Sequence, residues 1–542
     1  MRRTVVALML SSALGIGIAA VEQRPPTQAS GLRFEISFPD SVHHDPITGR
    51  VYVMISREND DEPRLQIGRT GVPFFGRDIV RLAAGRPTVI DDADLGTPIE
   101  RLHDLPPGDY FVQAFINVYS EFRRADGHTV WMHDDQWEGQ RWTRSPGNLK
   151  SAVKRVHLDS KAGDSVRLSA SEVIPPVEVP ADTDLVKRFK FQSPLLTNFW
   201  GRPVYLGATV LLPRDYARET MSYPVNYIQG HFSLNAPNNF DGNNAFSHAW
   251  LSDDFPRLIL VTLQHPNPYF DDSYAVNSVN VGPYGDAIMQ ELIPEVEKRF
   301  RAIKEPYARV LSGGSTGGWE ALALQLFHAD FFGGTWAYCP DPVTFTDVEG
   351  IDAYGDKNAF YKVYDWRREP TVNSRETDGR IRQTSEQRNR FELVSGTHGR
   401  SGEQLDIWSA VFGPLGDEGY FKPLFDKQTG VIDASVAEYW KDHYDLLEHL
   451  KRNWPTLGPK LVDKLHVYVG TMDTYQLNNA VAQLQAWMRA TTNPHYEAYF
   501  LYGDGKPHCW SGPVSPADRL KEMAQFIASK RPDWATTEWW RN

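Results

Sequence analysis

Hydrophobic positions follow two different periods, one before and one after about residue 180. Between residues 31 and 180 apolar and polar residues mainly alternate, as at Leu32, Phe34 and Ile36, a pattern typical of half-buried strands. A turn at 106–109 leads into a long β-rich run at 110–119. Because no convincing long helix accompanies these strands, residues 31–180 are predicted to form an all-β, sandwich-like domain.

The proline-rich stretch 175–180 is predicted to be an extended linker, and beyond it the pattern changes. Short apolar runs, of the kind that parallel sheets bury on both faces, now alternate with helical patterns. The runs are 204–212, 225–229, 258–263, 308–311, 333–338 and 465–470, and the helical patterns are 286–300, 319–327 and 477–490. Residues 187–542 are therefore predicted to form a doubly wound α/β domain.

The interval 341–464 is too long for a simple crossover between two strands, and it is rich in Tyr, Trp and Phe. Long insertions in compact domains often serve as lids or binding loops. We expect this interval to be an insertion that covers part of the α/β domain. Its aromatic side chains are predicted either to line a substrate pocket or to pack in a small core of their own.

Composition narrows the classes of function. The 542 residues include 57 Lys and Arg against 69 Asp and Glu, so the formal net charge is −12, and no cationic cluster suggests a nucleic-acid partner. With only two cysteines, a disulfide-built scaffold or a structural zinc site is excluded. The histidines show no metal-ligand spacing such as H-E-x-x-H, and neither metal nor cofactor is expected.

The first twenty residues are typical of a secretory signal peptide. Arg2 and Arg3 precede an apolar run at 5–20 that ends in small residues, and cleavage is expected near Ala19 or Ala20. A membrane anchor is the alternative, but the run is short for a full span. The mature protein is therefore expected to be periplasmic or secreted, without stable insertion into a membrane.

Gly313-Gly314-Ser315-Thr316-Gly317 fits the pattern G-x-S-x-G and stands between a strand pattern and a helical pattern. A nucleophile elbow needs this arrangement, because flanking glycines allow a tight turn that lifts the serine hydroxyl above the sheet. A glycine-rich loop is the alternative. We interpret Ser315 as a catalytic nucleophile.

A serine hydroxyl needs a base, usually a histidine oriented by a carboxylate, and the hydrolase order is serine, acid, histidine. Asp473 follows the strand 465–470 and is the predicted acid; the alternative role for Asp473 is that of a helix N-cap. Asp341 is the second candidate for the acid. His508 lies in a loop after a β-rich segment and is the predicted base. His495 is a weaker candidate because it precedes that segment.

An oxyanion hole needs two N–H donors. The backbone of Thr316, next to the nucleophile, is the first predicted donor. The second is expected from the loop after the strand 225–229, where either His231 or Phe232 follows Gly230.

The region from Lys187 to the C-terminus resembles the esterase D and feruloyl esterase branch of the α/β-hydrolases. The resemblance is carried by FQSPLL at 191–196, VLLPRDY at 210–216, GPYGD at 282–286, ELIP at 291–294 and the elbow. It implies hydrolysis of carboxylic esters through an acyl-enzyme without a cofactor, and it carries the catalytic roles onto Ser315, Asp473 and His508. The sequence departs from the branch at Gln229, where His-Gly is usual, and in its insertion and β-domain.

Several further residues belong to this prediction. Tyr274, Asn277 and Trp510 are expected to contact substrate. In an exported protein a disulfide between Cys339 and Cys509 is possible. Such a bond resembles the disulfide beside the triad in tannase-type esterases, although Cys339 is not adjacent to the serine here. The alternative is two buried free thiols.

The sequence thus predicts an exported serine hydrolase for small-molecule or polysaccharide-linked esters, feruloyl esters among them. The same triad would serve an acyltransferase or a peptidase. A carbohydrate- or wall-binding protein with a vestigial hydrolase domain is an alternative of another class. The β-domain is interpreted either as a binding accessory or as a cap that shapes the pocket.

Overall fold

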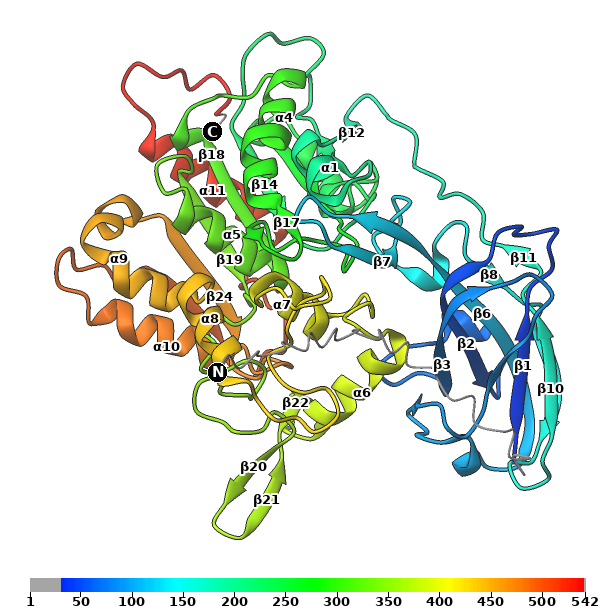
Figure 1. The fold of residues 1–542 in the computed structure, drawn as a ribbon. Coiled ribbons are helices and arrows are strands. Elements are labelled where there is room, and N and C mark those ends of the chain that lie inside the picture. The colour runs from blue at the N-terminus through cyan, green and yellow to red at the C-terminus, as the bar shows by residue number, and fades with distance from the viewer. Residues whose placement is uncertain (1–30, 541–542) are drawn as a thin grey trace, which may run out of the picture.

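The computed structural model describes residues 31–540, so the predicted signal peptide lies outside the described residues. Figure 1 shows two lobes, a smaller one made of strands and a larger one in which helices cover a sheet. The proline-rich stretch 175–180 carries neither helix nor strand and runs between the lobes.

Strands dominate the smaller lobe, which we call the β-domain (residues 31–180). They form a three-stranded sheet, β10-β1-β4, and a larger sheet, β11-β8-β6-β2-β3-β5, with β7 and β9 paired to β6. Alternate residues such as Phe34 and Ile36 point inward and share a core with Val51 and Val53. The strands are β1 (Arg33–Ser37), β2 (Ile47–Ser56), β3 (Phe74–Leu82), β4 (Thr88–Ile90), β5 (Gly96–Thr97), β6 (Gly108–Arg123), β7 (Thr129–His133), β8 (Leu149–Lys150), β9 (Lys154–Leu158), β10 (Ser165–Ser169) and β11 (Glu172–Val173).

The larger lobe is built on an eight-stranded sheet of order β12-β13-β15-β14-β18-β19-β24-β25. The first strands, β12, β13 and β15, pair antiparallel, and all later pairs are parallel. The carboxyl ends of the parallel strands therefore meet at one edge, where open α/β sheets place functional groups. The strands are β12 (Val186–Gln192), β13 (Tyr205–Leu211), β14 (Val225–Gln229), β15 (Ile259–Gln264), β18 (Arg309–Gly314), β19 (Gly334–Tyr338), β24 (Leu465–Gly470) and β25 (Tyr499–Gly503).

Helices flank this sheet. The predicted helix 286–300 is divided into α3 (Tyr284–Ala287), a π turn at 288–292 and α4 (Ile293–Arg299). The others are α1 (Pro194–Trp200), α2 (Ala245–Trp250), α5 (Thr316–Phe327), α10 (Asn478–Arg489) and α11 (Pro516–Lys530). The predicted helices 319–327 and 477–490 correspond to α5 and α10, whereas no sequence pattern indicated α1, α2 or α11.

The interval 341–464 is only partly an insertion. Its last helix, α9 (Leu446–Leu461), packs against α5 and so belongs to the layer that covers the sheet. The preceding part contains two hairpins and three helices, and one hairpin, β20–β21, projects from the lobe (Figure 1). These elements are β20 (Tyr361–Tyr364), β21 (Arg367–Pro370), β22 (Val372–Arg375), β23 (Ile381–Thr384), α6 (Ser385–Ser395), α7 (Gln404–Phe412) and α8 (Ala434–His443).

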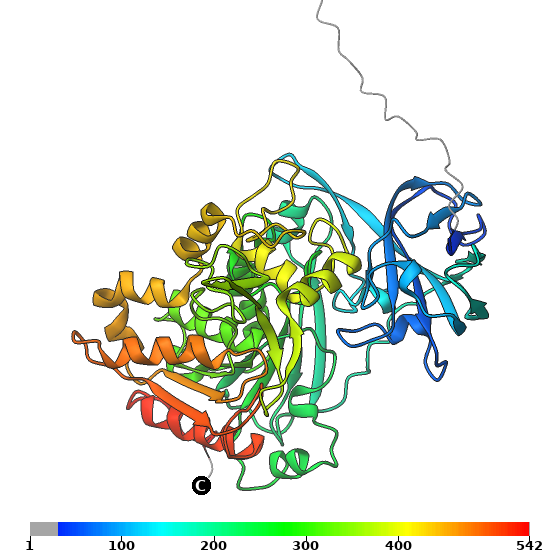
Figure 2. The same cartoon turned by 90° about the horizontal axis from the view of Figure 1, so that it is seen from below.

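The β-domain shares hydrophobic cores with the rest of the chain. Phe122 and Val130, from the ends of β6 and β7, belong to the same buried cluster as Trp200 of α1. A second cluster joins Trp142 of the β-domain to Phe391 of α6. Figure 2 shows α6, in yellow, between the α/β lobe and the blue strands. The two lobes are therefore packed together rather than linked only by residues 175–180.

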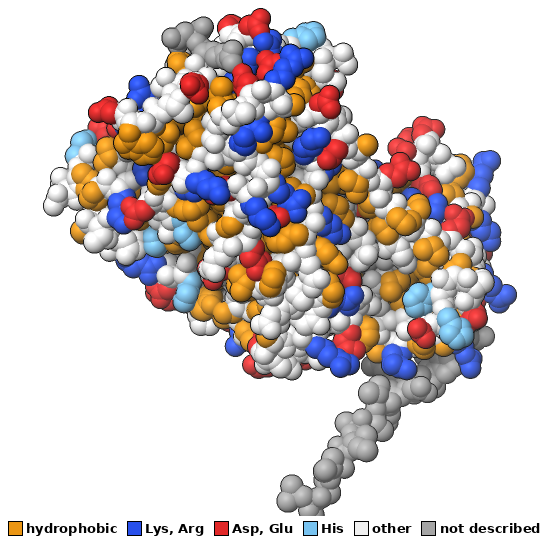
Figure 3. All heavy atoms as spheres, turned by 90° about the horizontal axis from the view of Figure 1, so that it is seen from above, with side chains coloured by type: hydrophobic (Ala, Val, Ile, Leu, Met, Phe, Trp, Pro, Cys, Tyr) orange, Lys and Arg blue, Asp and Glu red, His pale blue; other side chains and the backbone are white. Residues whose placement is uncertain are grey.

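The visible surface mixes both signs of charge. Figure 3 shows Lys and Arg side chains interspersed with Asp and Glu over one face of the molecule. Within residues 31–540, no helix combines the length and the apolar character that crossing a membrane requires.

Candidate active site

Ser315 lies at a sharp turn between β18 and α5, with backbone angles φ 58° and ψ −122°. Backbone strain of this kind is typical of a nucleophile elbow. Glycine is required on both sides of the turn. A Cβ on Gly317 would lie 2.2 Å from the carbonyl oxygen of Gln229, and one on Gly313 would lie 2.2 Å from the carbonyl oxygen of Gly317.

The structure brings the three predicted catalytic side chains into one hydrogen-bonded chain. His508 Nε2 lies 3.0 Å from Ser315 Oγ, and His508 Nδ1 lies 2.8 Å from Asp473 Oδ2. Asp473 follows β24 and His508 follows β25, so adjacent parallel strands deliver both groups to the edge where the elbow stands. Distances of this size allow a proton to pass from the serine to the imidazole.

Asp473 also holds the turn that leads into α10. Its Oδ1 atom accepts hydrogen bonds from the backbone N–H groups of Tyr475, at 2.9 Å, and Leu477, at 3.3 Å. The two roles considered for Asp473 are therefore compatible, since each uses a different oxygen. His495, the weaker candidate base, lies before β25 and contacts the Thr491 carbonyl oxygen at 2.8 Å.

The surroundings of His508 favour its protonated form. Burial, the largest single influence, lowers the pKa of this imidazole, but the hydrogen bonds and negative charges of Asp473 and Cys509 together outweigh burial. The pKa of His508 is therefore raised above its ordinary value of 6.5.

Asp341, the second choice for the acid, contacts the nucleophile instead of the base. Its Oδ1 atom accepts a hydrogen bond from Ser315 Oγ at 3.1 Å. Its Oδ2 atom accepts from Tyr274 Oη at 2.5 Å, and from Thr316 Oγ1 and Gln404 Nε2 at 3.1 Å each. Burial raises the pKa of Asp341. No sequence pattern indicated Gln404, because this contact depends on how the insertion folds back over α5.

The predicted oxyanion loop lies against the start of α5. Gly230 has φ 138°, and a Cβ there would lie 3.8 Å from Gly317 Cα. The two following side chains contact different partners. His231 Nδ1 lies 2.9 Å from Asp271 Oδ1, and the ring centroid of Phe232 lies 5.1 Å from that of Trp137. Thr316 begins α5, where N–H groups are free to bind an anion.

The three residues predicted to contact substrate differ in their surroundings. Tyr274 is fully buried and hydrogen-bonds Asp341, so it supports the site from behind. Asn277 exchanges hydrogen bonds with Asp286 at 2.9 and 3.0 Å. The indole of Trp510 lies against Gly503 at the end of β25. Their contact with substrate stays a prediction.

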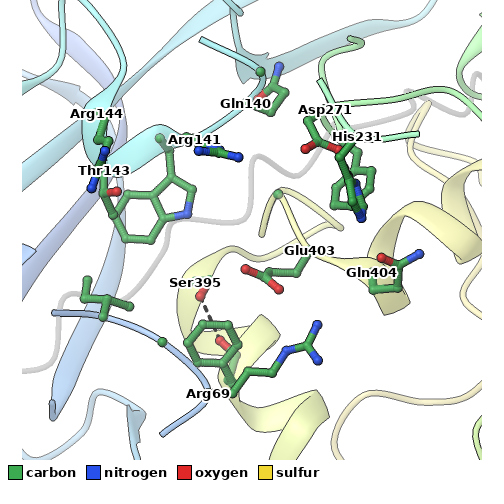
Figure 4. A pocket seen from close by; sticks show the side chains of 17 residues that line it. Arg69, Gln140, Arg141, Thr143, Arg144, His231, Asp271, Ser395, Glu403 and Gln404 are labelled. Carbon is green, nitrogen blue, oxygen red and sulfur yellow. Dashed lines mark hydrogen bonds and ion pairs between the residues drawn. The ribbon is translucent and has the colours of Figure 1, made fainter. Parts of the chain in front are cut away.

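A cavity of about 400 Å³ lies beside the site, between the β-domain, the oxyanion loop and the insertion (Figure 4). It shares His231 and Gln404 with the surroundings of the nucleophile. Most of its side chains come from segments that the sequence did not associate with the site. They are Ile67, Arg69, Gln140, Arg141, Trp142, Thr143, Arg144, His231, Phe270, Asp271, Phe391, Ser395, Glu403 and Gln404, with three glycines.

Cys339 and Cys509 do not form the predicted disulfide. Both are free thiols, Cys339 buried and Cys509 exposed, whereas a bond needs the two sulfurs at about 2.05 Å. The sulfurs and a ring nitrogen of His508 nevertheless lie within 4.8 Å of one another. The hydrogen bond from Cys339 lowers the pKa of Cys509 to about 5.

Two groups of side chains have the donor types and the spacing to hold a metal ion. One is Cys339, His508 and Cys509, and the other is His231, Asp271 and Asp272, each with its ligand atoms within 4.8 Å. The first includes His508, the predicted base, which would be unable to accept a proton while it bound a metal. In the second, His231 already donates to the carboxylates.

One family model matches part of the chain. The Esterase family model matches residues 205–399, about a third of the chain, from β13 through α6. This segment contains Ser315 but ends before Asp473 and His508. A search of curated proteins gave no match.

Solved structures with an overall similarity include a ferulic acid esterase at 16% identity and a TM-score of 0.36, covering 64% of this chain and 97% of the other. The fluorophosphonate-binding serine hydrolase FphF of Staphylococcus aureus has 13% identity, a TM-score of 0.34 and coverages of 63% and 98%. An S-formylglutathione hydrolase of Agrobacterium tumefaciens has 12% identity, a TM-score of 0.34 and coverages of 63% and 94%.

The family match and the elbow at Ser315 define the class of this protein: it is an enzyme, a carboxylic-ester hydrolase. The resemblance to an esterase branch that the sequence predicted agrees with this match at the level that the model states, a putative esterase.

Proposed function

We propose that this protein is an exported serine esterase that cleaves carboxylic esters through an acyl-enzyme. Ser315 is the nucleophile, His508 the base and Asp473 the group that orients the base. The observation that carries the proposal is the continuous hydrogen-bonded chain from Ser315 Oγ through the two nitrogens of His508 to Asp473.

In the first half-reaction Ser315 Oγ attacks the acyl carbon while His508 Nε2 takes its proton. The Asp473 carboxylate, which is fully buried, stabilises the imidazolium that forms. The backbone N–H of Thr316 and one from the loop after Gly230 stabilise the negative charge on the carbonyl oxygen. His508 then gives its proton to the departing alcohol.

In the second half-reaction water attacks the acyl-enzyme. His508 takes a proton from the water and returns it to Ser315 Oγ as the acid leaves. Asp341 hydrogen-bonds the same serine hydroxyl in the resting site, and we infer that it holds the side chain in place.

Hydroxycinnamoyl and other carbohydrate-linked esters are the proposed substrates. The resemblance to the feruloyl esterase branch supports this choice. Export is supported by the charged start and apolar run of residues 1–20. Amino-terminal sequencing of the protein from a periplasmic or culture fraction should give a chain that begins just after Ala19 or Ala20.

The catalytic proposal is tested with a panel of chromogenic acetyl, butyryl and feruloyl esters, comparing wild type with Ser315→Ala and His508→Ala. Both variants should lose at least 10³-fold in kcat while keeping the wild-type circular dichroism. Full turnover by folded His508→Ala would overturn the proposed mechanism. The acyl preference of the wild type would narrow the substrate.

A further inference from the structure

The cavity beside the active site has an unbalanced charge. Arg69, Arg141 and Arg144 line it, all three from the β-domain and all three exposed. Among the described residues none of these guanidinium groups forms an ion pair with a carboxylate, in contrast to most arginines of this chain. Unpaired cations grouped in a concave site attract anions.

The carboxylates of the cavity are already neutralised by other partners. Asp271 pairs with His231 at 2.9 Å, and Glu403 pairs with the buried Arg388 at 3.0 Å. His231 also lies 3.1 Å from Asp272, so its imidazole is matched by carboxylates and adds nothing to the charge of the three arginines. The cavity therefore keeps a positive excess that no carboxylate lining it offsets.

The segment that carries Arg141 is held rigidly. The carboxylate of Asp135 accepts hydrogen bonds from four backbone N–H groups of residues 137–140, at 2.9 to 3.2 Å. On the other side of Arg141, the indole N–H of Trp142 donates to the Ser401 carbonyl oxygen of the insertion at 3.2 Å, and its ring stacks on Tyr52. Figure 4 shows the Arg141 side chain directed into the cavity from this segment.

The cavity reaches the catalytic residues from two directions. Gln404, on its wall, hydrogen-bonds Asp341, which contacts the nucleophile. Arg69 donates to the Tyr475 hydroxyl at 2.7 Å, and the ring of Tyr475 packs edge-on against His508 at 4.9 Å. Gln404 and Arg69 on the cavity wall are thus each separated from Ser315 or His508 by a single intervening side chain.

We propose that this cavity is a subsite for an anionic group of the ester substrate, with Arg69 and Arg141 as its ligands. Guanidinium groups bind carboxylate, sulfate and phosphate groups through paired N–H donors. The enzyme would thus select esters that carry a negative charge several bonds from the scissile carbonyl. This inference rests on the proposed function, because it places the subsite relative to Ser315.

The test compares pairs of esters in which one member carries a free carboxylate and the other has that carboxylate methylated, and the arginine variants correct for differences in intrinsic reactivity within a pair. For the acyl side the pair is mono-4-nitrophenyl glutarate and its methyl ester, and for the alcohol side it is 4-carboxyphenyl butyrate and its methyl ester. The wild type should show a higher kcat/KM for the anionic member of one pair, and that pair identifies the side on which the charge lies.

The preference should depend on the two arginines. In Arg141→Gln and in Arg69→Gln the ratio of kcat/KM for the anionic ester to that for the neutral ester should fall about tenfold, mainly through KM, because a charge-assisted hydrogen bond is lost. Arg141→Lys should retain part of the preference. Arg86→Gln, at an exposed turn of the β-domain away from the cavity, is the matched control and should leave the ratio unchanged.

Failure of the subsite and failure of the esterase function give different results. Ester hydrolysis with no anionic preference in either pair, or with a ratio unmoved in Arg69→Gln/Arg141→Gln, would overturn the subsite alone. If the folded wild type hydrolyses no ester, the proposed function fails, and calorimetric titration with glutarate then decides the subsite. Binding weakened at least tenfold in the double variant supports it, and equal binding to both proteins refutes it.

Discussion

His508 receives opposing influences, and their balance sets the conditions under which it can act as a base. Burial disfavours the imidazolium, whereas Asp473 and Cys509 favour it. The raised pKa means that a larger fraction of the imidazole is protonated near neutral pH than in an ordinary histidine. Since only the neutral ring can accept the serine proton, activity should be lost as the pH falls through this raised pKa.

The acid limb of the kcat/KM profile is therefore expected above pH 6.5, the ordinary value for histidine. Asp473→Asn removes the charge that raises the pKa, so the limb should move to lower pH. Because the orientation of the imidazole is lost as well, kcat should fall by about four orders of magnitude. A pH–rate series on both proteins measures this, and a limb that stays in place would contradict the assigned partner.

Cys509 provides a second, smaller test of the same electrostatics. Its pKa of about 5 means that it carries negative charge beside His508 at neutral pH. Cys509→Ser should shift the acid limb downward, while kcat stays within about tenfold because the triad is intact. Cys339→Ala should act in the same direction, since the hydrogen bond from Cys339 is the largest cause of the lowered pKa of Cys509. Unchanged pH profiles in both variants would exclude this influence.

At the scale of elements, the elbow depends on the close approach of β14, β18 and α5. Gly317 allows this approach because the carbonyl oxygen of Gln229 occupies the space that a side chain would need. This contact also places the predicted oxyanion loop next to Ser315. A side chain at position 317 would therefore disturb both the backbone packing and the position of that loop.

Gly317→Ala should therefore displace either the oxyanion loop or the start of α5. We expect a loss of kcat of at least 10²-fold, comparable with the removal of an oxyanion donor, and a lower free energy of unfolding. The matched control is Gly31→Ala, because a Cβ there meets no atom within 4 Å and Gly31 does not line the cavity. Steady-state kinetics and urea unfolding measure the two effects, and wild-type behaviour of Gly317→Ala would contradict the described packing.

The β-domain is part of the catalytic molecule at the largest scale. It contributes Phe122 to the main core, Trp142 to the cluster with α6, and the arginines of the cavity. Because its apolar surface is shared with the α/β lobe, we expect the two lobes to unfold together. This packing favours a cap that shapes the pocket over a detachable binding module.

Trp142→Ala tests that expectation. The indole is 7% exposed, stacks on Tyr52 and hydrogen-bonds the insertion, so its loss should cost about 3–5 kcal/mol of unfolding free energy. Urea unfolding followed by circular dichroism and by fluorescence should give one coincident transition in the wild type. Two separate transitions in the wild type, only one of them destabilised by Trp142→Ala, would show that the lobes unfold independently.

Sequence patterns predicted the local features of this fold but not the contacts between segments that are distant in the chain. Strand periodicity and the G-x-S-x-G turn are short-range patterns, and they led to Ser315, Asp473 and His508 because chain order follows strand order at one edge of the sheet. The contacts of Asp341 and Gln404 with the nucleophile depend on how the insertion folds back. No periodic pattern encodes that path, and the same holds for Arg69, which lies more than 400 residues from Tyr475.

The central claim is that Ser315 is a nucleophile activated by His508, and covalent trapping tests it most directly. The mature wild type, Ser315→Ala and His508→Ala would each be incubated with a fluorophosphonate and examined by intact-protein mass spectrometry. We expect one adduct on the wild type, mapped to Ser315 by peptide digestion, none on Ser315→Ala, and labelling slowed at least 10²-fold in His508→Ala. A folded wild type that takes no label, or an adduct that persists in Ser315→Ala, would contradict the assignment of the nucleophile.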